Sequence, residues 1–462
     1  MAKGASISGF PEWLPSERVV EQRVIDTLRR VFELNGFIGV ETRAVEQGSS
    51  LLKKGETSKE IYLLSRLQEV GHESDTPVND RLGLHFDLTV PLSRYVVEHS
   101  GDLAFPFKRW QIQKVWRGER PQEGRFREFV QADIDVIGNG DLPDHYEVEL
   151  PLVMVSALEE LRAFGLPKAT VHANNRKLSE GFYRGLGLTD IEGVLREIDK
   201  LDKIGPEKVG DILTQDCGLT REQAEEILRF ISIGGGNAQV VAALEQYAGR
   251  SELFDTGLAE LKAVTANLAA FGVPEENFAV DLTIARGLDY YTGTVYETTL
   301  LDHPEIGSVC SGGRYDNLAG YYIDKPLPGV GISIGLTRLF YVLDEQGLLN
   351  PALPSAPADA LVLPMTADMA PAIALAETLR SAGLRVQLYG EQKKFKQKMA
   401  YANKLGVPYA VLLGEDEIEK GLCSVKNMQS GEETEIRLDE ISESLMNIIN
   451  SAALDELAES IL

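Results

Sequence analysis

The sequence predicts an α+β fold, in which an antiparallel sheet is flanked by helices and is joined by a helical insertion and a C-terminal α/β domain. Apolar, non-helical runs with hairpin-like turns recur before residue 137 and after residue 277, and such runs favour antiparallel pairing. Between them, residues 166–275 become helical and charged. After residue 358, strand-like and helix-like segments alternate, which indicates parallel βαβ units.

The first predicted element is a helix that Ser16 can cap. Apolar residues recur along it at Val20, Val24, Leu28 and Val31, and Asn35-Gly36 closes it. The strands expected for the antiparallel sheet are residues 37–42, 84–88, 111–117, 129–136, 278–285, 294–299 and 331–334. The polar residues 65–80 are expected to form a loop.

The insertion is expected to follow a short strand at residues 169–172. Leu195, Ile198 and Leu201 then recur as on one face of a helix, and the glycines 234–236 interrupt the helical run.

A proline-rich linker precedes the C-terminal domain, with prolines at 351, 354 and 357. Three strands are expected in that domain, separated by two helices, at residues 360–363, 384–388 and 409–413. The second helix carries Phe395, Met399 and Ala402 on one face, so it should pack on the sheet.

Composition limits the class of protein. The 462 residues are 44% hydrophobic, no apolar run approaches a membrane span, and the three scattered cysteines suggest a reducing cytosol. The net charge of −25 disfavours indiscriminate nucleic-acid binding. Local basic patches remain candidates for a nucleic-acid partner, and two occur, at residues 108–127 and 393–398.

Residues Gly331 to Gly335 match the G-x-S-x-G pattern of a serine hydrolase, and a helix is expected after them. That fold needs a histidine after the serine in chain order. The last histidine of this chain is His303, which precedes Ser333, so the pattern favours a structural strand over an esterase site.

Two other segments carry richer polar chemistry. Arg286-Gly287-Leu288-Asp289-Tyr290-Tyr291 places a cation, a carboxylate and two phenols near one bend, which suits an anionic polar ligand or a structural ion pair. Residues 117–127 form an arginine-rich loop between two strands. The second strand carries Gln131, Asp133 and Asp135 on one face, because alternate strand residues share a face, so it predicts a polar pocket floor.

These segments together resemble the class II aminoacyl-tRNA synthetases, and within them the histidyl-tRNA synthetases. Residues 117–121 (Arg-Gly-Glu-Arg-Pro) resemble motif 2 and residues 329–338 resemble motif 3. Residues 286–291 resemble the histidine-specific signature, residues 312–316 match Gly-Gly-Arg-Tyr-Asp, and residues 87–91 match Asp-Leu-Thr-Val-Pro. The resemblance covers nearly the whole chain.

The resemblance implies a role for each matching residue. Arg286 and Arg117 are implied as catalytic residues that hold the α-phosphate of ATP. The ATP site is implied to include Arg117, Glu119, Arg125, Phe126 and Arg338. The histidine site is implied to include Asp87, Leu88, Thr89, Gln131, Asp135, Arg286, Tyr290 and Tyr291. Contacts to tRNA are implied for Gln122, Lys393, Lys394 and Lys396. No side chain is assigned to a metal.

The resemblance also implies the reaction and the partners. It implies ATP-dependent ligation of L-histidine to tRNA(His) through a histidyl-adenylate, with release of AMP and pyrophosphate. Mg²⁺ would bridge the phosphates, and a cytoplasmic homodimer is expected. The alternative is a histidine-binding regulatory subunit of ATP phosphoribosyltransferase that does not charge tRNA. Such paralogues lack the anticodon domain, whereas this chain retains a matching C-terminal segment.

The implied domains follow the same resemblance. We expect a catalytic domain at 1–165 and 276–345, a helical insertion at 166–275, a linker at 346–358, an anticodon-binding domain at 359–450 and a tail at 451–462.

The chain departs from the family pattern at three places. Arg43 stands where motif 1 normally has proline, so the resemblance leaves the detail of the dimer interface open. Thr337 replaces the acidic residue usual before the motif 3 arginine. Asp135 stands where some members have glutamate, which is longer by one methylene group.

Overall fold

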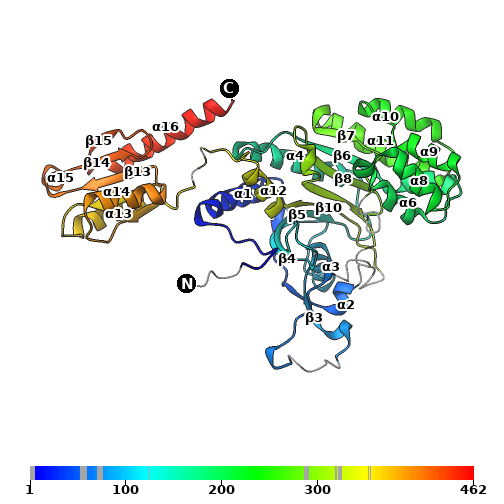
Figure 1. Ribbon diagram of the computed structural model, residues 1–462, viewed down its shortest axis with the longest axis horizontal. Coiled ribbons are helices and arrows are strands. Elements are labelled where there is room, and N and C mark those ends of the chain that lie inside the picture. The colour runs from blue at the N-terminus through cyan, green and yellow to red at the C-terminus, as the bar shows by residue number, and fades with distance from the viewer. Residues whose placement is uncertain are drawn as a thin grey trace. The chain divides into compact units, whose positions relative to one another are not determined.

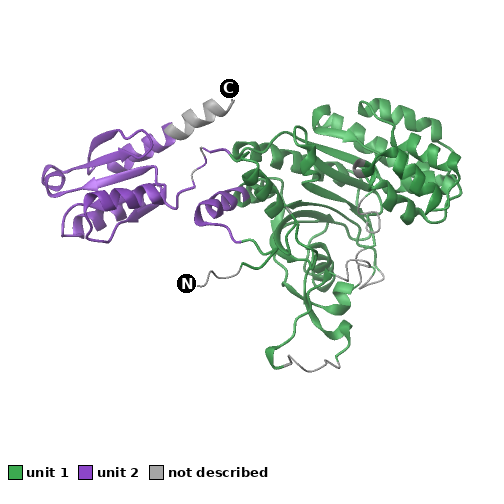
Figure 2. Cartoon of the chain, viewed as in Figure 1, with its two compact units in different colours: residues 1–11, 25–349 green, residues 12–24, 350–462 purple. Residues whose placement is uncertain are grey.

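The computed structural model describes residues 6–52, 60–69, 76–122, 124–285, 291–317, 320, 325–351, 353 and 355–461, without the side chains of 202–203 and 452–461. This described part of the chain divides into two compact units (Figure 2). The first comprises residues 1–11 and 25–349, and the second comprises residues 12–24 and 350–462. No helix among the described residues is long and apolar enough to cross a membrane.

The first unit is built on a sheet that has eight strands among the described residues, in the order β1-β4-β5-β10-β9-β8-β6-β7 (Figure 1). The strands are β1 Ile38–Gly39, β4 Phe107–Trp116, β5 Glu128–Ile137, β6 Ala169–Asn175, β7 Phe278–Val280, β8 Thr294–Leu300, β9 Cys310–Tyr315 and β10 Gly329–Gly335. The β1–β4 and β6–β7 pairs are parallel and the other pairs are antiparallel. The predicted antiparallel sheet with flanking helices is confirmed.

The two faces of this sheet differ in polarity because alternate strand residues face opposite sides. Ile134 of β5, Ile332 of β10 and Tyr296 of β8 lie in register on one face and are buried. On that face, the hydroxyl of Tyr296 donates to the backbone carbonyl of Glu147 in α4 (Tyr146–Leu161). The apolar face is therefore covered by α4, and the opposite face is left for polar side chains.

Helices surround the sheet and gather at its β6–β7 end, as Figure 1 shows for α6 to α11. Outside the insertion, the helices of the first unit are α2 Gly48–Leu51, α3 Thr89–Glu98, α4 and α12 Leu336–Glu345. The helix α1 Pro15–Leu34 begins in the second unit and ends in the first. A short two-stranded sheet pairs β2 Val45–Gln47 with β3 Leu82–Leu84. The insertion holds α5 Arg176–Gly185, α6 Ile191–Ile198, α7 Leu201–Ile204, α8 Pro206–Gln215, α9 Arg221–Ile231, α10 Asn237–Leu244 and α11 Glu252–Ala270.

The insertion has its own apolar core, which explains why its amphipathic helices fold there. Phe182 of α5 stacks on Phe230 of α9 at 3.9 Å, and Tyr247 and Phe254 close the cluster. A capping box at Thr220 starts α9, because the hydroxyl accepts from a backbone N–H that otherwise has no partner. The break predicted at the glycines 234–236 lies between α9 and α10.

The second unit contains a sheet in the order β12-β11-β13-β14-β15, which has five strands within the described residues. The predicted βαβαβ segment is confirmed, with β11 Ala360–Pro364, β12 Val386–Leu388 and β13 Tyr409–Leu413 in parallel. An antiparallel pair that the sequence analysis missed, β14 Leu422–Asn427 and β15 Glu433–Arg437, extends it. The helices are α13 Ala370–Ser381, α14 Phe395–Leu405, α15 Glu415–Lys420 and α16 Ile441–Ile461.

Several predicted strand bounds were wrong. Residues 37–42 keep strand structure only at Ile38–Gly39, and residues 278–285 leave the sheet after Val280. The strands β7 and β8 do not pair with each other, since both pair with β6. The strand predicted at residues 84–88 is β3, which ends at Leu84.

The strand β9 was missed because its glycines weaken a strand pattern. Gly312 is required there by close backbone approach, since a Cβ at this position would lie 2.2 Å from the carbonyl oxygen of Gly331.

Candidate active site

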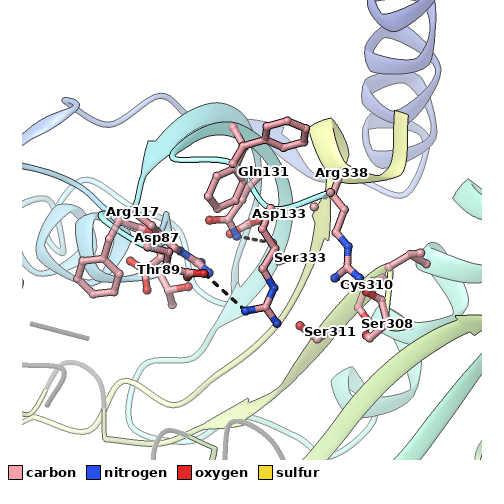
Figure 3. A pocket seen from close by; sticks show the side chains of 18 of the residues that line it. Asp87, Thr89, Arg117, Gln131, Asp133, Ser308, Cys310, Ser311, Ser333 and Arg338 are labelled. Carbon is pink, nitrogen blue, oxygen red and sulfur yellow. Dashed lines mark hydrogen bonds and ion pairs between the residues drawn. The ribbon is translucent and has the colours of Figure 1, made fainter. Parts of the chain in front are cut away.

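A cavity of about 450 Å³ opens over the polar face of the first sheet (Figure 3). Side chains from the centre of the sheet, from the loop after β4 and from α12 surround it. The lining residues are Glu60, Phe86, Asp87, Thr89, Arg117, Glu119, Gly124, Arg125, Phe126, Phe129, Gln131, Asp133, Tyr291, Ser308, Val309, Cys310, Ser311, Ser333, Gly335 and Arg338.

Strand register builds the floor of this cavity from successive rungs of residues. The rungs that run across β4, β5, β10 and β9 are Arg109–Asp135–Gly331–Gly313, then Gln111–Asp133–Ser333–Ser311, then Gln113–Gln131–Gly335. The predicted shared face of Gln131, Asp133 and Asp135 is therefore confirmed by the register.

A hydrogen-bond chain links three residues of the floor, and Figure 3 shows them between the two labelled arginines. The Nε2 group of Gln131 donates to the Oγ of Ser333 at 2.7 Å. Ser333 in turn donates its hydroxyl proton to Asp133. Ser333, the serine of the G-x-S-x-G pattern, is thus bonded to a carboxylate and an amide. This arrangement supports the preference for a structural strand over an esterase nucleophile.

Asp135 follows Asp133 on the same face of β5 and is held by two side chains. The guanidinium of the fully buried Arg109 lies 2.7 Å from one carboxylate oxygen, and the hydroxyl of Tyr315 donates to the other at 2.5 Å. Arg109 also lies 3.9 Å from Asp133, so one buried cation serves two buried acids. Burial raises the pKa of Asp133 to about 7 and that of Asp135 to about 6, and the Arg109 charge partly offsets both shifts.

Arginines approach the cavity from two sides (Figure 3). Arg117 follows β4, and its Nε donates to the carbonyl of Phe86 at 3.0 Å while its guanidinium lies over the ring of Phe129. Arg338 projects from α12, and its Nη2 donates to the carbonyl of Ile306 at 2.6 Å. Such anchored guanidinium groups suit a polyanionic ligand, because they bind phosphate oxygens without needing to reorganise.

The loop after β4 adds a carboxylate and an aromatic ring. Glu119 lies within 4 Å of both Arg117 and Arg125, at 3.9 and 3.8 Å. Phe126 packs edge-on against Tyr341 of α12, with ring centroids 5.3 Å apart, so the ring is held at the cavity wall. A planar apolar ligand could stack there.

Most of the predicted site residues meet in this cavity. Its lining includes Asp87, Thr89, Gln131 and Tyr291 from the predicted histidine site, and Arg117, Glu119, Arg125, Phe126 and Arg338 from the predicted ATP site. Leu88 is fully buried, and neither Leu88 nor the buried Asp135 is among the lining residues. Arg286 and Tyr290 lie outside the described residues.

Asp133 and Ser333 are the floor residues to which the sequence analysis gave no ligand role. In the sequence, only strand alternation could have pointed to these two residues, because it places them on the face that carries Gln131. The hydrogen bond between them depends on the pairing of β5 with β10. Glu60 was also missed. Burial raises its pKa, as does the nearby charge of Glu119.

The two basic patches are smaller than the sequence suggested. Arg109 is fully buried and paired with Asp135, and Lys108 is paired with Glu149. In the second unit, Lys398 is 3% exposed and donates to the carbonyl of Pro364. Lys393, Lys394 and Lys396 are exposed, and so is Gln122 in the first unit.

Thr337, which departs from the family pattern, has a structural explanation. Its buried hydroxyl accepts a hydrogen bond from the backbone N–H of Val130 in β5 at 2.8 Å. Threonine thereby ties α12 to the strand that carries the floor.

Comparisons with known proteins identify the family of the chain. A family model described as histidyl-tRNA synthetase matches residues 9–339, and one described as anticodon binding domain matches residues 359–448. The histidine–tRNA ligase of Bifidobacterium longum subsp. infantis is 63% identical over 450 residues, which cover 94% of this chain and 96% of the relative. That of Micrococcus luteus is 48% identical and covers 94% of this chain and 95% of the relative.

Solved structures show the same fold. The crystal structure of histidyl-tRNA synthetase from Nostoc sp. PCC 7120 matches with a TM-score of 0.86 and 38% identity, covering 97% of this chain and 100% of that one. An ATP phosphoribosyltransferase regulatory subunit/histidyl-tRNA synthetase from Bacillus halodurans shares the fold at a TM-score of 0.71 and 21% identity, covering 89% of this chain and 98% of that one. From the two family matches and the close relatives, the chain belongs to the histidyl-tRNA synthetase family.

Proposed function

We propose that the chain is an ATP-dependent histidine–tRNA ligase. One observation supports this most: a single cavity joins anchored arginines at its walls to a floor of hydrogen-bond acceptors. The arginines suit the phosphates of ATP, and the acceptors suit an amino acid that carries an ammonium group and an imidazole.

The first step needs charge stabilisation and positioning. The carboxylate oxygen of histidine attacks the α-phosphorus of ATP, the bond to the bridging oxygen breaks, and pyrophosphate leaves. Negative charge grows on the phosphate oxygens, so Arg117 at the α-phosphate and Arg338 at the γ-phosphate would stabilise the transition state. Arg286 is proposed to act with Arg117. In the second step, a ribose hydroxyl of the terminal adenosine of tRNA attacks the acyl carbon and AMP leaves.

The nucleotide base would lie at the loop after β4. Phe126 would stack on the base, Glu119 would accept a hydrogen bond from the amino group of adenine, and Arg125 would contact the nucleotide at the edge of the cavity. All three side chains line the same cavity, which supports these assignments.

The amino-acid end would lie over the floor. Asp87, Thr89 and Gln131 would orient the ammonium and carboxylate groups, and Tyr291, with Tyr290, would meet the imidazole. Asp135 would also meet the imidazole. Burial raises the pKa of Tyr291, and the charge of Asp135 adds to that shift. Tyr291 therefore stays a hydrogen-bond donor at neutral pH.

Mg²⁺ is proposed to enter with ATP, held by its phosphates. This ion binds proteins through one or two carboxylates and keeps several waters. Glu60 and Glu119 line the cavity on the side of Arg117, which fits such a partial ligand set. Among the described residues no group of three His, Cys, Asp or Glu side chains gathers as a metal cage. When bound, the ion would neutralise phosphate charge.

The partners follow from the second unit and from the family. Lys393, Lys394 and Lys396 lie at the start of α14, in the part matched by the anticodon binding domain, and we propose that they contact tRNA(His) phosphates. Gln122 is proposed to contact tRNA near the cavity. We also propose a homodimer and a cytoplasmic location.

Histidine-dependent exchange of labelled pyrophosphate into ATP tests the adenylation step. We expect exchange with L-histidine and none without an amino acid. Arg117→Ala should lower the rate by roughly two to three orders of magnitude. Arg120→Ala is the matched control, because Arg120 is an exposed arginine of the same loop that does not line the cavity. Equal losses in both variants would contradict the role of Arg117, and absent exchange in the natural protein would contradict the function.

A further inference from the structure

The carboxamide of Gln131 is bonded on one side and open on the other. Its Nε2 group donates to Ser333 at 2.7 Å. Its Oε1 atom is buried and has no hydrogen-bond partner among the described residues, although Gln131 lines the cavity and is 8% exposed. A buried acceptor without a partner at a cavity wall indicates a ligand that donates.

The orientation of this amide follows from the proton of Ser333. A serine hydroxyl has one proton, and Ser333 gives it to Asp133. An ionised carboxylate can only accept, so the Ser333 oxygen must accept its second bond from Gln131. The NH₂ group of Gln131 therefore faces Ser333, and its buried carbonyl oxygen is turned away from Ser333. In the reversed orientation, the carbonyl oxygen of Gln131 and the carboxylate of Asp133 would both need the single hydroxyl proton of Ser333.

The bond needs the ionised form of Asp133. Burial raises the pKa of this carboxyl to about 7, and the negative charges of Asp135 and Asp87 add to that shift. Arg109 of β4, 3.9 Å away, favours ionisation, so the carboxylate is available above about pH 7. Arg109 is closer to Asp135, at 2.7 Å, so it supplies charge to Asp133 without occupying the oxygen that Ser333 uses.

We propose that Asp133 and Ser333 are positioning residues that fix the amide of Gln131, so that the site presents an acceptor to the ammonium group of the amino acid. They act through Gln131 and need not touch the substrate. This inference rests on the proposed function for the identity of the ligand, but the amide orientation itself does not depend on it.

The Asp133→Asn variant tests the proposal with almost no change in shape. The carboxamide that replaces the carboxylate can either accept from Ser333 or donate to it. When it donates, Ser333 can donate to Gln131, so the orientation of the Gln131 amide is no longer fixed. We expect the KM for histidine to rise on the order of ten- to a hundredfold, with kcat and the KM for ATP nearly unchanged, because the ammonium contact persists through the reaction.

A second substitution separates positioning from a structural role. Glutamate presents acceptors whichever way it turns, so adding Gln131→Glu to Asp133→Asn should restore the KM for histidine at least about tenfold relative to Asp133→Asn. A variant that had merely lost packing would not be rescued. An unchanged KM in Asp133→Asn, or a raised KM that Gln131→Glu does not lower, would overturn the proposal.

A readout without substrate keeps this test independent of the enzyme's function. The side-chain ¹⁵N–¹H signal of Gln131, assigned by its loss in Gln131→Glu, should show slowed hydrogen exchange in the natural protein. Asp133→Asn and Ser333→Ala should abolish that protection. Ser311→Ala is the control, because Ser311 pairs with Ser333 in register but takes no part in the hydrogen bonds that join Gln131, Ser333 and Asp133. Equal hydrogen-exchange rates at Gln131 in all variants would refute the proposed orientation of its amide. A failure to exchange labelled pyrophosphate into ATP, with the Gln131 result as expected, would refute only the proposed function.

Discussion

Arg109 is a buried cation of the floor, and replacing it with methionine should destabilise the first unit in a pH-dependent way. The side chain of Arg109 is fully buried and pairs with Asp135 at 2.7 Å. Removing one partner of such a pair costs about 3–5 kcal/mol, because the other charge is left buried without compensation. Methionine is similar in length, so Arg109→Met changes the charge with little loss of packing.

The pH dependence follows from the two acids. Their folded pKa values, about 7 for Asp133 and about 6 for Asp135, lie above the ordinary value near 4 of an unfolded Asp. Each raised group therefore contributes stability that is full below pH 4 and is lost as the pH rises to the folded pKa. Arg109 lowers both folded values, so in Arg109→Met this loss continues to higher pH. The deficit should widen by up to about 1.4 kcal/mol per acid for each pH unit above 7.

Urea unfolding at pH 6.5 and pH 8 measures this deficit. Trp110 and Trp116 of β4 report the strand of Arg109 by fluorescence, in a Trp13→Phe background that silences the tryptophan of the second unit. Arg162→Met is the control, because Arg162 and Glu159 form a half-exposed helix pair that should contribute less than about 1 kcal/mol. A deficit of equal size at both pH values would refute the reasoning, and so would no deficit at all.

Two further variants test the floor and the second unit. Gly331→Ala would put a Cβ 2.0 Å from a carboxylate oxygen of Asp135, so it should lower the melting temperature and raise the KM for histidine. The control Gly101→Ala has open space around the new Cβ and should change neither quantity. Equal melting temperatures for the two variants would count against the packing argument. Lys396→Ala should weaken tRNA(His) binding in filter assays and leave pyrophosphate exchange unchanged. Lys420→Ala, on α15, is the control. Altered pyrophosphate exchange with unchanged tRNA affinity would contradict the role of Lys396.

The floor of the site could be predicted in part. Strand parity placed Gln131, Asp133 and Asp135 on one face, since that depends on local alternation. It could not reveal that Asp135 is engaged by Arg109 and Tyr315, because these come from β4 and β9, and their register with β5 is set by the whole sheet.

The C-terminal unit shows the same limit. The parallel strands had strong apolar runs and were predicted. The strands β14, which mixes apolar and polar residues, and β15, which is mostly polar and charged, were missed. The lysine run was interpreted as one patch, yet Lys398 lies four residues before the buried Ala402 on α14. Helical spacing could have placed it on the packed face.

Charging of a tRNA(His) transcript with labelled histidine tests the central proposal most directly. The natural protein, with ATP and Mg²⁺, should form histidyl-tRNA in proportion to the transcript and release one AMP for each ester formed. A regulatory histidine-binding protein would bind the amino acid and form no ester. Histidine binding without any acid-precipitable histidyl-tRNA would contradict the account.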